Sequence, residues 1–364
     1  MKEEFRNIVK VASVYMATII GAGFASGQEI VRFFTHYYKG GFYGILVAGI
    51  LFAVMGCIVL NKVYCERIRN YDEFLFPTVG WFLGWIMEIT VTLFMISLFC
   101  VMIAGMGNIL LEKFNLPFQY GIVAMALLCM AVILTDMKGI VSVSAFVTPL
   151  LTLGITAIGL YIVLFNDTLA FNPVGLLYKT TDNWLFSALI YVSYNSIMSV
   201  VVLCTLLPYL KTKRTGIVGG LLGGGLLCLI ALILNTAILI FAPGSLLKEL
   251  PVLFIVQKYG NAASNIYTFL LWLAMFLSAV TSGYCVVDRV GSKVSVNPKL
   301  LAVIICALVL PLSSFGFSNL IAGIYPVFGY IGLFMVFVVL FQGIKSISPR
   351  RLKKHFASHH NFKF

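Results

Sequence analysis

The chain has 364 residues, of which 61% are hydrophobic and only 10% are charged. Soluble domains carry about 25% charged residues, so this composition excludes an ordinary soluble domain and indicates an integral membrane protein. The formal net charge of +12 would, by itself, be compatible with nucleic-acid binding. The basic residues gather in alternate connections between apolar segments, however, which is typical of membrane topology. We therefore expect no nucleic-acid partner.

Ten apolar segments approach or exceed the ~20 residues that a helix needs to cross the hydrocarbon core of a bilayer. They cover residues 8–37, 41–62, 81–111, 117–135, 139–165, 185–209, 215–242, 261–288, 299–315 and 318–343. The connections are too short to fold as a separate domain. We therefore expect an all-α integral membrane protein with ten transmembrane helices that form one membrane domain.

The distribution of Lys and Arg predicts the orientation of these segments. If the N-terminus is cytoplasmic, nineteen of the 25 basic residues fall on the cytoplasmic side, and five fall on the other side, namely Lys39, Lys113, Lys179, Lys248 and Lys258. The positive-inside rule therefore places both the N-terminus and the C-terminus in the cytoplasm. We expect a multi-pass protein of the cell (plasma) membrane, surrounded by the lipid bilayer.

Ten crossings with both ends on one side divide into two sets of five, and the second set then enters the membrane from the opposite face. Many secondary transporters have this inverted-repeat layout. We expect residues 1–165 to form the first repeat, residues 185–343 the second, and residues 344–364 a basic cytoplasmic tail. The expectation rests on the count and polarity of the segments, since no sequence identity between the halves is visible.

The first span is interrupted by IIGAGFASGQEIVRFF, residues 19–34. A glycine costs about 1 kcal/mol relative to alanine inside a helix, and unwound backbone is tolerated in a membrane only where it lines a cavity or is buried in protein. Ser26 and Glu29 fit the capping box that begins a helix, so we expect a second half-helix to start near Gly27. Gly23 and Gly27 also fit the GxxxG helix-contact pattern, which is the alternative interpretation.

A broken span presents two kinds of binding group near the bilayer midplane. The positive N-terminal end of the second half-helix suits a carboxylate, and the carbonyl groups left at the end of the first half-helix suit a cation. We therefore place part of a site for a small-molecule substrate at Gly23, Phe24, Ser26 and Gly27.

The sixth span contains a polar centre that would complete this site. In IYVSYNSIMS, residues 190–199, the polar side chains of Tyr191, Ser193, Tyr194 and Asn195 lie where lipid favours leucine. We assign them to the substrate site and expect a second discontinuity here. Hydrogen bonds to neighbouring helices are the alternative, since this stretch has no glycine or proline.

Charged residues inside apolar segments are functional by default. Glu29 and Arg32 lie three residues apart in the first span, where they are candidates for a gate or for carrying protons. Glu88 lies in the third span, where it would either relay protons or bond to a neighbouring span.

The eighth span carries three hydroxyl groups on one helical face. Ser278, Thr281 and Ser282 follow an i, i+3, i+4 spacing in FLSAVTSGYCVVDR, so they present three oxygens in one direction. In combination with the broken first span, this face is a candidate ion site. The alternative is that the hydroxyls pack or bond back to the preceding turn, as Ser and Thr often do in helices.

Together these segments resemble a known family. GAGFASGQEI in the first span, the polar centre of the sixth and S-x-x-T-S in the eighth resemble the YkvI-like family of uncharacterised bacterial membrane proteins, which is similar to the amino acid–polyamine–organocation superfamily with the LeuT-type five-plus-five fold. The resemblance implies a sodium site made of the carbonyls of Ala22 and Ala25 with Ser278, Thr281 and Ser282. Proton-coupled relatives often place a lysine of the fifth span at this point, whereas residues 139–165 contain no Lys or Arg, which favours sodium.

The sequence contains no P-loop, HExxH, GxSxG or dinucleotide-binding motif, so we expect neither an enzyme nor a bound cofactor. We expect a secondary active transporter that moves a small amino acid or related amine by alternating access around a midplane site, with Na⁺ as the coupling ion. The alternatives are a proton-coupled transporter, a nutrient receptor of the germinant type that uses a transporter fold, and a pore.

Overall fold

The computed structural model describes residues 2–134, 138–165, 183–291, 294 and 296–347, and its regular structure is entirely helical over these residues. Two parts of the expected topology, Lys179 and residues 348–364 of the tail, lie outside the described residues. The helices are α1 (Lys2–Ile19), α2 (Ala22–Ser26), α3 (Gln28–Phe33), η1 (Thr35–Tyr37), α4 (Lys39–Glu66), α5 (Tyr71–Val79), α6 (Trp81–Phe114), α7 (Phe118–Ile133), α8 (Lys138–Phe165), α9 (Trp184–Cys204), η2 (Leu207–Tyr209), α10 (Lys213–Ile240), η3 (Gly244–Leu247), α11 (Pro251–Gln257), α12 (Asn261–Gly291), α13 (Pro298–Ser313) and α14 (Phe317–Ile347).

Most of these helices have the length and composition of membrane-spanning segments. Among the described residues, six helices are long and apolar enough to cross a bilayer, namely α4, α6, α9, α10, α12 and α14. The apolar segments Phe118–Ile133, Pro149–Phe165 and Pro298–Ser313 are shorter. The first apolar segment of the sequence is divided among α1, α2 and α3. The chain is thus a multi-pass membrane protein.

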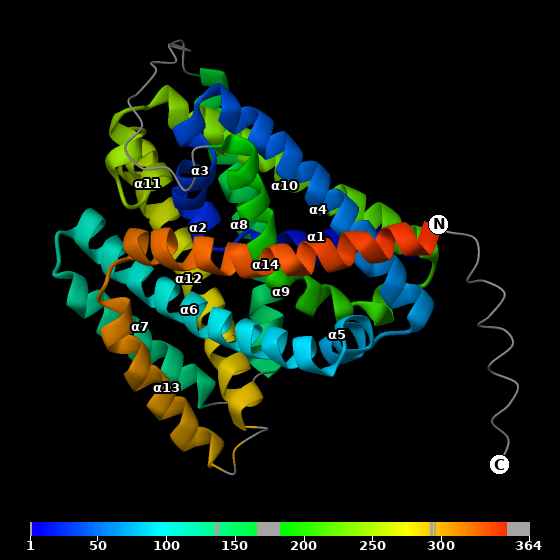
Figure 1. The fold of residues 1–364 in the computed structure, drawn as a ribbon. Helices are drawn as coiled ribbons and strands as arrows, with labels where there is room; N and C mark the ends of the chain where they lie inside the picture. The colour runs from blue at the N-terminus through cyan, green and yellow to red at the C-terminus, as the bar shows by residue number, and fades with distance from the viewer. Residues whose placement is uncertain (1, 135–137, 166–182, 292–293, 295, 348–364) are drawn as a thin grey trace, which may run out of the picture.

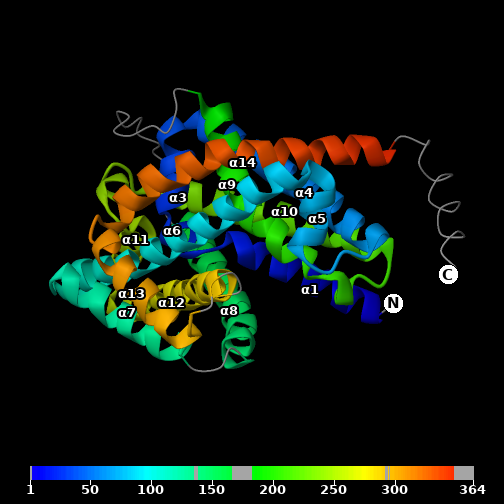
Figure 2. The same ribbon diagram turned by 60° about the horizontal axis from the view of Figure 1, so that its bottom comes forward.

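Helices that are distant in the sequence lie side by side. α4 packs along α10, α9 along α14, and α6 along α12 (Figure 1). α7 and α13 contact each other and lie together at one edge of the molecule in both views (Figures 1 and 2). α1 lies against α9 and α10, while α2 contacts α11 and α12. The interrupted first segment is therefore enclosed by helices from the second half of the chain.

The first span is interrupted, as predicted, but at two places. α1 ends at Ile19, Gly21 has an extended backbone (φ −93°, ψ −172°), and α2 begins at Ala22. A second change of direction occurs at Gly27, whose φ of 85° is in the left-handed region that glycine adopts at little cost. The longer interruption thus precedes Ala22, and only a single residue separates the two short helices at the predicted position.

The predicted discontinuity of the sixth span is wrong, because α9 is a continuous helix from Trp184 to Cys204. Its polar side chains donate hydrogen bonds to carbonyl groups of the same helix and do not interrupt it. The hydroxyl of Ser193 donates to the carbonyl of Leu189 at 2.6 Å, and the amide nitrogen of Asn195 donates to the carbonyl of Tyr191 at 3.0 Å. Without glycine or proline in this stretch, nothing offsets the cost of leaving backbone groups unpaired.

A row of glycines brings α10 into backbone contact with α4. A Cβ atom added at Gly220 would lie 2.6 Å from the backbone nitrogen of Cys57, and one added at Gly224 would lie 2.5 Å from the Cα of Ala53. Real Cβ contacts are longer than this, so glycine at both positions permits the close approach. A Cβ atom at the adjacent Gly225 would meet nothing within 4 Å.

These two neighbouring glycines make a matched pair for substitution. We expect Gly224→Ala to lower the midpoint of thermal unfolding in detergent, because the new methyl group meets backbone that cannot rotate away, and overpacking of this kind costs about 1–3 kcal/mol. Gly225→Ala should leave the midpoint unchanged or raise it, since alanine favours the helix by about 1 kcal/mol. Equal midpoints for the two variants would contradict the backbone contact.

Candidate substrate and ion site

A cavity of about 690 Å³ lies between α1, α6, α9, α12 and α14. Lys10, which is exposed, lines one end, and Glu29, which is buried, lines the other. Nine residues of α1 separate Lys10 from Ile19, a distance of ~14 Å along a helix. The cavity therefore runs from a mouth near the beginning of α1 to the interruption of the first span.

The end of α1 leaves carbonyl groups without their helical hydrogen bonds beside this cavity. The N–H of Gly21 donates to the carbonyl of Ile19 at 2.9 Å, so the carbonyl of Ala17 loses the partner that a continuous helix would give it. The carbonyl of Thr18 likewise accepts no backbone hydrogen bond from the described residues that follow it. Ala17, Thr18 and Gly21 all line the cavity. A Cβ atom at Gly21 would meet nothing within 4 Å, so the space beside the break is open.

The three hydroxyl residues of the eighth span, on α12, line the same cavity. Elsewhere in the helices Thr and Ser bond back to the carbonyl four residues earlier, as Thr90, Ser97, Thr236 and Thr268 do. Within the part of the chain that the structure describes, Ser278, Thr281 and Ser282 make no such bond and no other side-chain hydrogen bond. Their oxygens therefore remain available to a ligand.

The structure does not assemble the sodium site that the family resemblance implies. The hydroxyl of Tyr267 donates to the carbonyl of Ala25, and Tyr267 precedes Ser278 by eleven residues on α12, or ~16 Å along a helix. Neither Ala22 nor Ala25 lines the cavity. The reason is that the chain re-enters a helix at Ala22, so the open carbonyls are those of Ala17 and Thr18, earlier in the sequence.

Glu29 lies on α3, the short helix that follows Gly27 in the interrupted span. The hydroxyl of Tyr194, on α9, donates to Glu29 Oε2 at 2.8 Å. A Cβ atom at Gly23 would lie 2.9 Å from the carboxyl carbon of Glu29 and closer still to one of its oxygens. Gly23 is therefore needed to make room for this carboxylate.

The predicted capping box is wrong in its partners. The hydroxyl of Ser26 donates to the carbonyl of Gly23 at 3.0 Å and accepts from the N–H of Gln28 at 3.3 Å. The carboxylate of Glu29 bonds to Tyr194 rather than reaching back to Ser26. The hydrogen bond to Tyr194 on α9 thus holds the Glu29 carboxylate away from the backbone N–H that a capping box would use.

The predicted substrate residues fall into two groups. Those that line the cavity are Tyr194 and Asn195. Those that are buried outside the described lining are Gly23, Phe24, Ser26, Gly27, Tyr191 and Ser193. Gly27 illustrates the second group, because a Cβ atom there would lie 2.8 Å from Val252 and 3.0 Å from Ile238. It contacts α11 and α10 rather than an approaching ligand.

The three charged candidates lie in different places, and one of them lines the cavity. Glu29 lines the cavity, whereas half-buried Arg32 lies farther along the chain on α3 and forms no ion pair with it. Glu88 Oε1 and Arg289 Nη1, from α6 and α12, form a salt bridge of 2.7 Å. The guanidinium of Arg289 also lies 6.0 Å from the ring centroid of Tyr71 on α5. This geometry favours a bond to a neighbouring span over a proton relay for Glu88.

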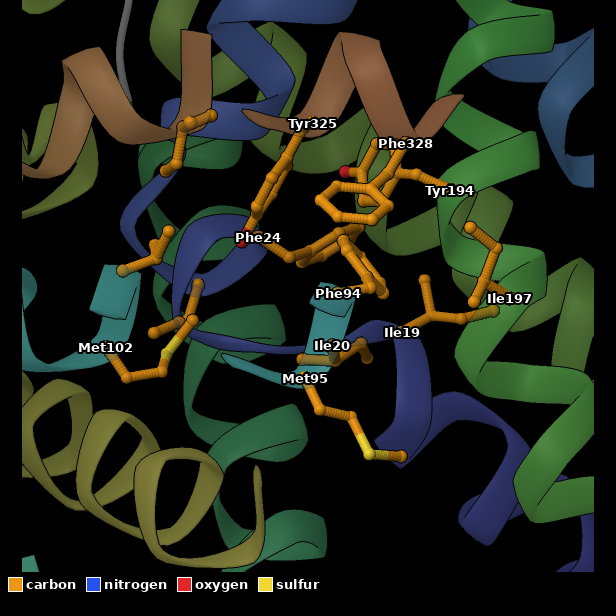
Figure 3. Packing of buried hydrophobic residues seen from close by; sticks show 14 of the residues in the cluster. Ile19, Ile20, Phe24, Phe94, Met95, Met102, Tyr194, Ile197, Tyr325 and Phe328 are labelled. Atoms are coloured by element: carbon orange, nitrogen blue, oxygen red, sulfur yellow. The ribbon is translucent and has the colours of Figure 1, made fainter. Parts of the chain in front are cut away.

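The site contains aromatic residues that the sequence did not single out. Phe94 and Tyr325, from α6 and α14, line the cavity, and Figure 3 shows them turned toward Tyr194 and Phe24. The ring centroids of Tyr194 and Tyr325 are 4.6 Å apart. From the sequence of an apolar span, an aromatic residue that lines a cavity cannot be distinguished from one that packs between helices, since its role depends on which helices lie next to it.

The molecule is closed beyond Glu29, at the end opposite the mouth. Most of α11 is buried there, and Glu249, which precedes it, accepts hydrogen bonds from two membrane-spanning helices. Glu249 Oε2 accepts from the N–H of Ser318 at 2.8 Å and from the amide of Asn108 at 3.0 Å. Burial raises the pKa of the Glu249 carboxyl above its ordinary value, and these two hydrogen bonds oppose the rise. The first turn of α14 and α6 are therefore joined through one carboxylate.

Removing this carboxylate should loosen the closed end. We expect Glu249→Ala to accelerate hydrogen–deuterium exchange at the start of α14 and in α11, because the N–H of Ser318 loses a charged acceptor worth about 1.5–3 kcal/mol, or roughly 10- to 150-fold in local opening. Mass spectrometry of peptides from these segments measures the change. Glu66→Ala, an exposed change at the other end of α4, is the control. Unchanged exchange at Ser318 would show that Glu249 does not hold this end closed.

A scan against models of protein families finds no match. Two curated proteins of Bacillus subtilis (strain 168) are similar over nearly their whole length. The uncharacterised membrane protein YkvI is 27% identical over 356 residues, which cover 96% of this chain and 99% of YkvI. The uncharacterised protein YyaD is 26% identical over 332 residues, which cover 91% of this chain and 95% of YyaD.

Solved transporter structures share the fold at low sequence identity. The manganese transporter of Eremococcus coleocola has a TM-score of 0.60 at 13% identity, with 92% of this chain and 78% of that chain covered. A Na⁺-coupled sialic acid symporter has a TM-score of 0.56 at 13% identity, with 90% and 75% covered. These neighbours are membrane transporters and not enzymes. The chain is therefore a multi-pass membrane protein related to the YkvI-like uncharacterised membrane proteins, and its fold is that of the LeuT-type transporters.

Proposed function

We propose that the chain is a secondary active transporter that moves a small amino acid or related amine together with sodium, by alternating access around the cavity. Two features support a transport cycle. The cavity is open at the Lys10 end, and it is closed beyond Glu29 by α11 and the hydrogen bonds of Glu249. The solved structures that share this fold are transporters.

The membrane arrangement that goes with this function has ten crossings in two inverted sets of five. The first set contains the broken span α1–α3 with α4, α6, α7 and α8, within residues 1–165, and the second contains α9, α10, α12, α13 and α14, within residues 185–343. The excess of Lys and Arg in the connections on the N-terminal side supports a cytoplasmic position for the Lys10 end and for both termini. In this orientation the cavity opens inward.

The observation that carries the sodium assignment is the set of hydroxyls on α12 without protein partners. Ser278, Thr281 and Ser282 line the cavity, as do Ala17 and Thr18, whose carbonyls are left open by the end of α1. Carbonyls at the end of a half-helix and hydroxyls of a facing helix are oxygen ligands suited to Na⁺. The proposed ion site therefore keeps the three α12 residues and replaces Ala22 and Ala25 by Ala17 and Thr18.

Coupling follows from the position of this ion site relative to the substrate site. The ion binds the end of α1, and Glu29, on α3, contacts Tyr194 at the substrate end of the same cavity. Both ligands bind to the two parts of one interrupted span, so occupancy of one site alters the arrangement available to the other. Such coupling is reciprocal in binding free energy.

Sodium should stabilise the purified protein in a saturable manner. We expect the unfolding midpoint to rise with NaCl at constant total salt, with KCl as the replacement. Thr281→Ala and Ser282→Ala should each weaken the apparent sodium affinity by about 5- to 150-fold, since removing one ligand oxygen from the site costs about 1–3 kcal/mol. Thr236→Ala is the control, because Thr236 bonds back to Leu232 and does not line the cavity.

Two results would overturn this ion site. A wild-type protein that responds to pH but not to sodium would make the transporter proton-coupled and assign the proton to Glu29. A sodium-dependent protein in which both α12 variants behave like Thr236→Ala would place the ion elsewhere. Uptake into proteoliposomes separates transport from the receptor alternative, since a receptor binds its ligand without accumulating it.

The orientation has its own test on α4, whose ends are exposed at Lys39 and Cys65. In a background without the other native cysteines, Lys39→Cys should react with an impermeant maleimide in whole cells. A single cysteine at position 65 should react only after the cells are permeabilised, because 26 residues of helix separate the two positions, or ~39 Å. Labelling of position 65 in intact cells would reverse the proposed orientation.

A further inference from the structure

The cavity ends at a carboxylate that has no cationic partner in the described chain. Glu29 is 4% exposed, and the hydrogen bond that it accepts comes from the neutral hydroxyl of Tyr194. Lys10 is the only other charged residue among the described residues that line the cavity, and it lies at the mouth. Burying an ionised carboxylate without a counter-charge is costly. The ionised form of Glu29 therefore requires a cation from outside the chain.

Three aromatic rings from three helices lie at the same end of the cavity. The ring centroids of Phe94 and Tyr194 are 6.1 Å apart, those of Phe94 and Tyr325 are 6.2 Å apart, and those of Tyr194 and Tyr325 are 4.6 Å apart. Figure 3 shows the three side chains converging from α6, α9 and α14. Aromatic faces attract cations that lie within about 6 Å of the ring centroid. The rings thus favour the same ligand charge as Glu29.

A further polar group at this end offers an acceptor. Asn195 lines the cavity, and one N–H of its amide is used in a bond to the carbonyl of Tyr191 at 3.0 Å. The amide oxygen is left for a ligand, and an oxygen acceptor suits the N–H groups of an ammonium ion. Among the described residues at this end, no Lys, Arg or His lines the cavity to bind a substrate carboxylate.

The carboxyl group at the break comes from the protein itself. The half-helix beginning near Gly27 was expected to bind a carboxylate of the substrate. α3 is only six residues long, and the carboxylate of Glu29 fills the space beside Gly23. The sign of the complementary ligand group is therefore reversed.

We propose that the substrate of this cavity is an organic cation, a protonated amine whose ammonium group binds Glu29 between Phe94, Tyr194 and Tyr325. The assignment rests on the transport function proposed for the same cavity, and it narrows the substrate class from amino acids and amines to amines that need no carboxylate. Apolar side chains such as Leu98 and Met198 line the cavity between this end and the mouth. They suit the carbon skeleton of the amine, and a cavity of 690 Å³ has the size typical of small-molecule sites.

A series of ligands with one ring and different charge tests the proposal. Isothermal titration of the purified full-length protein is carried out with benzylamine, benzyl alcohol, phenylacetate and phenylalanine. We expect saturable binding of benzylamine, with benzyl alcohol and phenylacetate at least tenfold weaker. Phenylalanine should gain nothing from its carboxylate. Binding of phenylacetate or benzyl alcohol as tight as that of benzylamine would overturn the proposal, as would absence of saturable benzylamine binding.

Two variants locate the charge recognition. Glu29→Gln preserves the shape of the side chain and should weaken benzylamine binding by about 10- to 150-fold, the range for a hydrogen bond to a charged group. Glu66→Gln, an exposed change on α4, is the matched control. Phe94→Leu keeps the site apolar and should weaken benzylamine by about 2- to 30-fold, as for a lost cation–π contact, with a smaller effect on benzyl alcohol. Wild-type benzylamine affinity in Glu29→Gln, or equal losses for both ligands in Phe94→Leu, would overturn the assignment.

Failure of this inference is distinguishable from failure of the transport proposal. If a sodium gradient drives accumulation of a compound with which benzylamine does not compete, transport stands and the amine assignment falls. If benzylamine binds through Glu29 but no gradient drives amine uptake into proteoliposomes, the amine site stands and transport falls.

Discussion

A bilayer offers no water to an unpaired peptide group, and this constraint determines how the first span is built and what surrounds it. Because α1 stops at Ile19, the carbonyls of its last turn need a polar space. The cavity supplies that space, and the α12 hydroxyls face into it. Gly21 leaves the break open and Gly23 leaves room for the Glu29 carboxylate. The site therefore depends on a short stretch of the chain that cannot be helical throughout.

The closed end of the cavity and the sides of the molecule are held by different kinds of contact. Beyond Glu29 one carboxylate, that of Glu249, accepts hydrogen bonds from a helix N–H and from a side-chain amide, and water can replace these bonds when the segments separate. The sides of the molecule are held by steric contact, most closely where α10 meets α4. Exchangeable polar contacts at a closed end and close packing elsewhere are the combination that hinge and rocking motions require.

The sequence predicted an all-helical membrane protein, the broken first span and the polar face of the eighth, because each depends on local composition. Hydrophobic length identifies a membrane helix, glycines identify a break, and an i, i+3, i+4 spacing identifies a face. The sequence-based prediction was wrong where the structure depends on contacts between groups that are distant in the sequence or on the exact position of a helix end. The break begins earlier than predicted, so the carbonyls without helical partners are those of Ala17 and Thr18 and not those of Ala22 and Ala25. The continuity of α9 followed from bonds within that helix.

The capping bond of Glu29 was wrongly predicted for the same reason. A Ser-x-x-Glu pattern is a good indication of a helix start, but the hydroxyl of Tyr194, 165 residues away in the sequence, offers the carboxylate a different bond. The aromatic side chains of Phe94 and Tyr325 join it from two further helices. No pattern within one span could reveal this group, whereas the pairing of α6, α9 and α14 places all of its members together.

The spacing of the glycines on α10 limits how this helix can travel along α4. Gly216, Gly220 and Gly224 recur every fourth residue and each faces backbone or Cβ atoms of α4. A displacement along the helix axis by less than this repeat would move the three glycines away from the backbone that they contact. A displacement by the full repeat, ~6 Å for four residues, would again place a glycine at the contact. α4 and α10 therefore form a rigid pair, and shorter elements such as the helices α2 and α3 of the first span can change position relative to it.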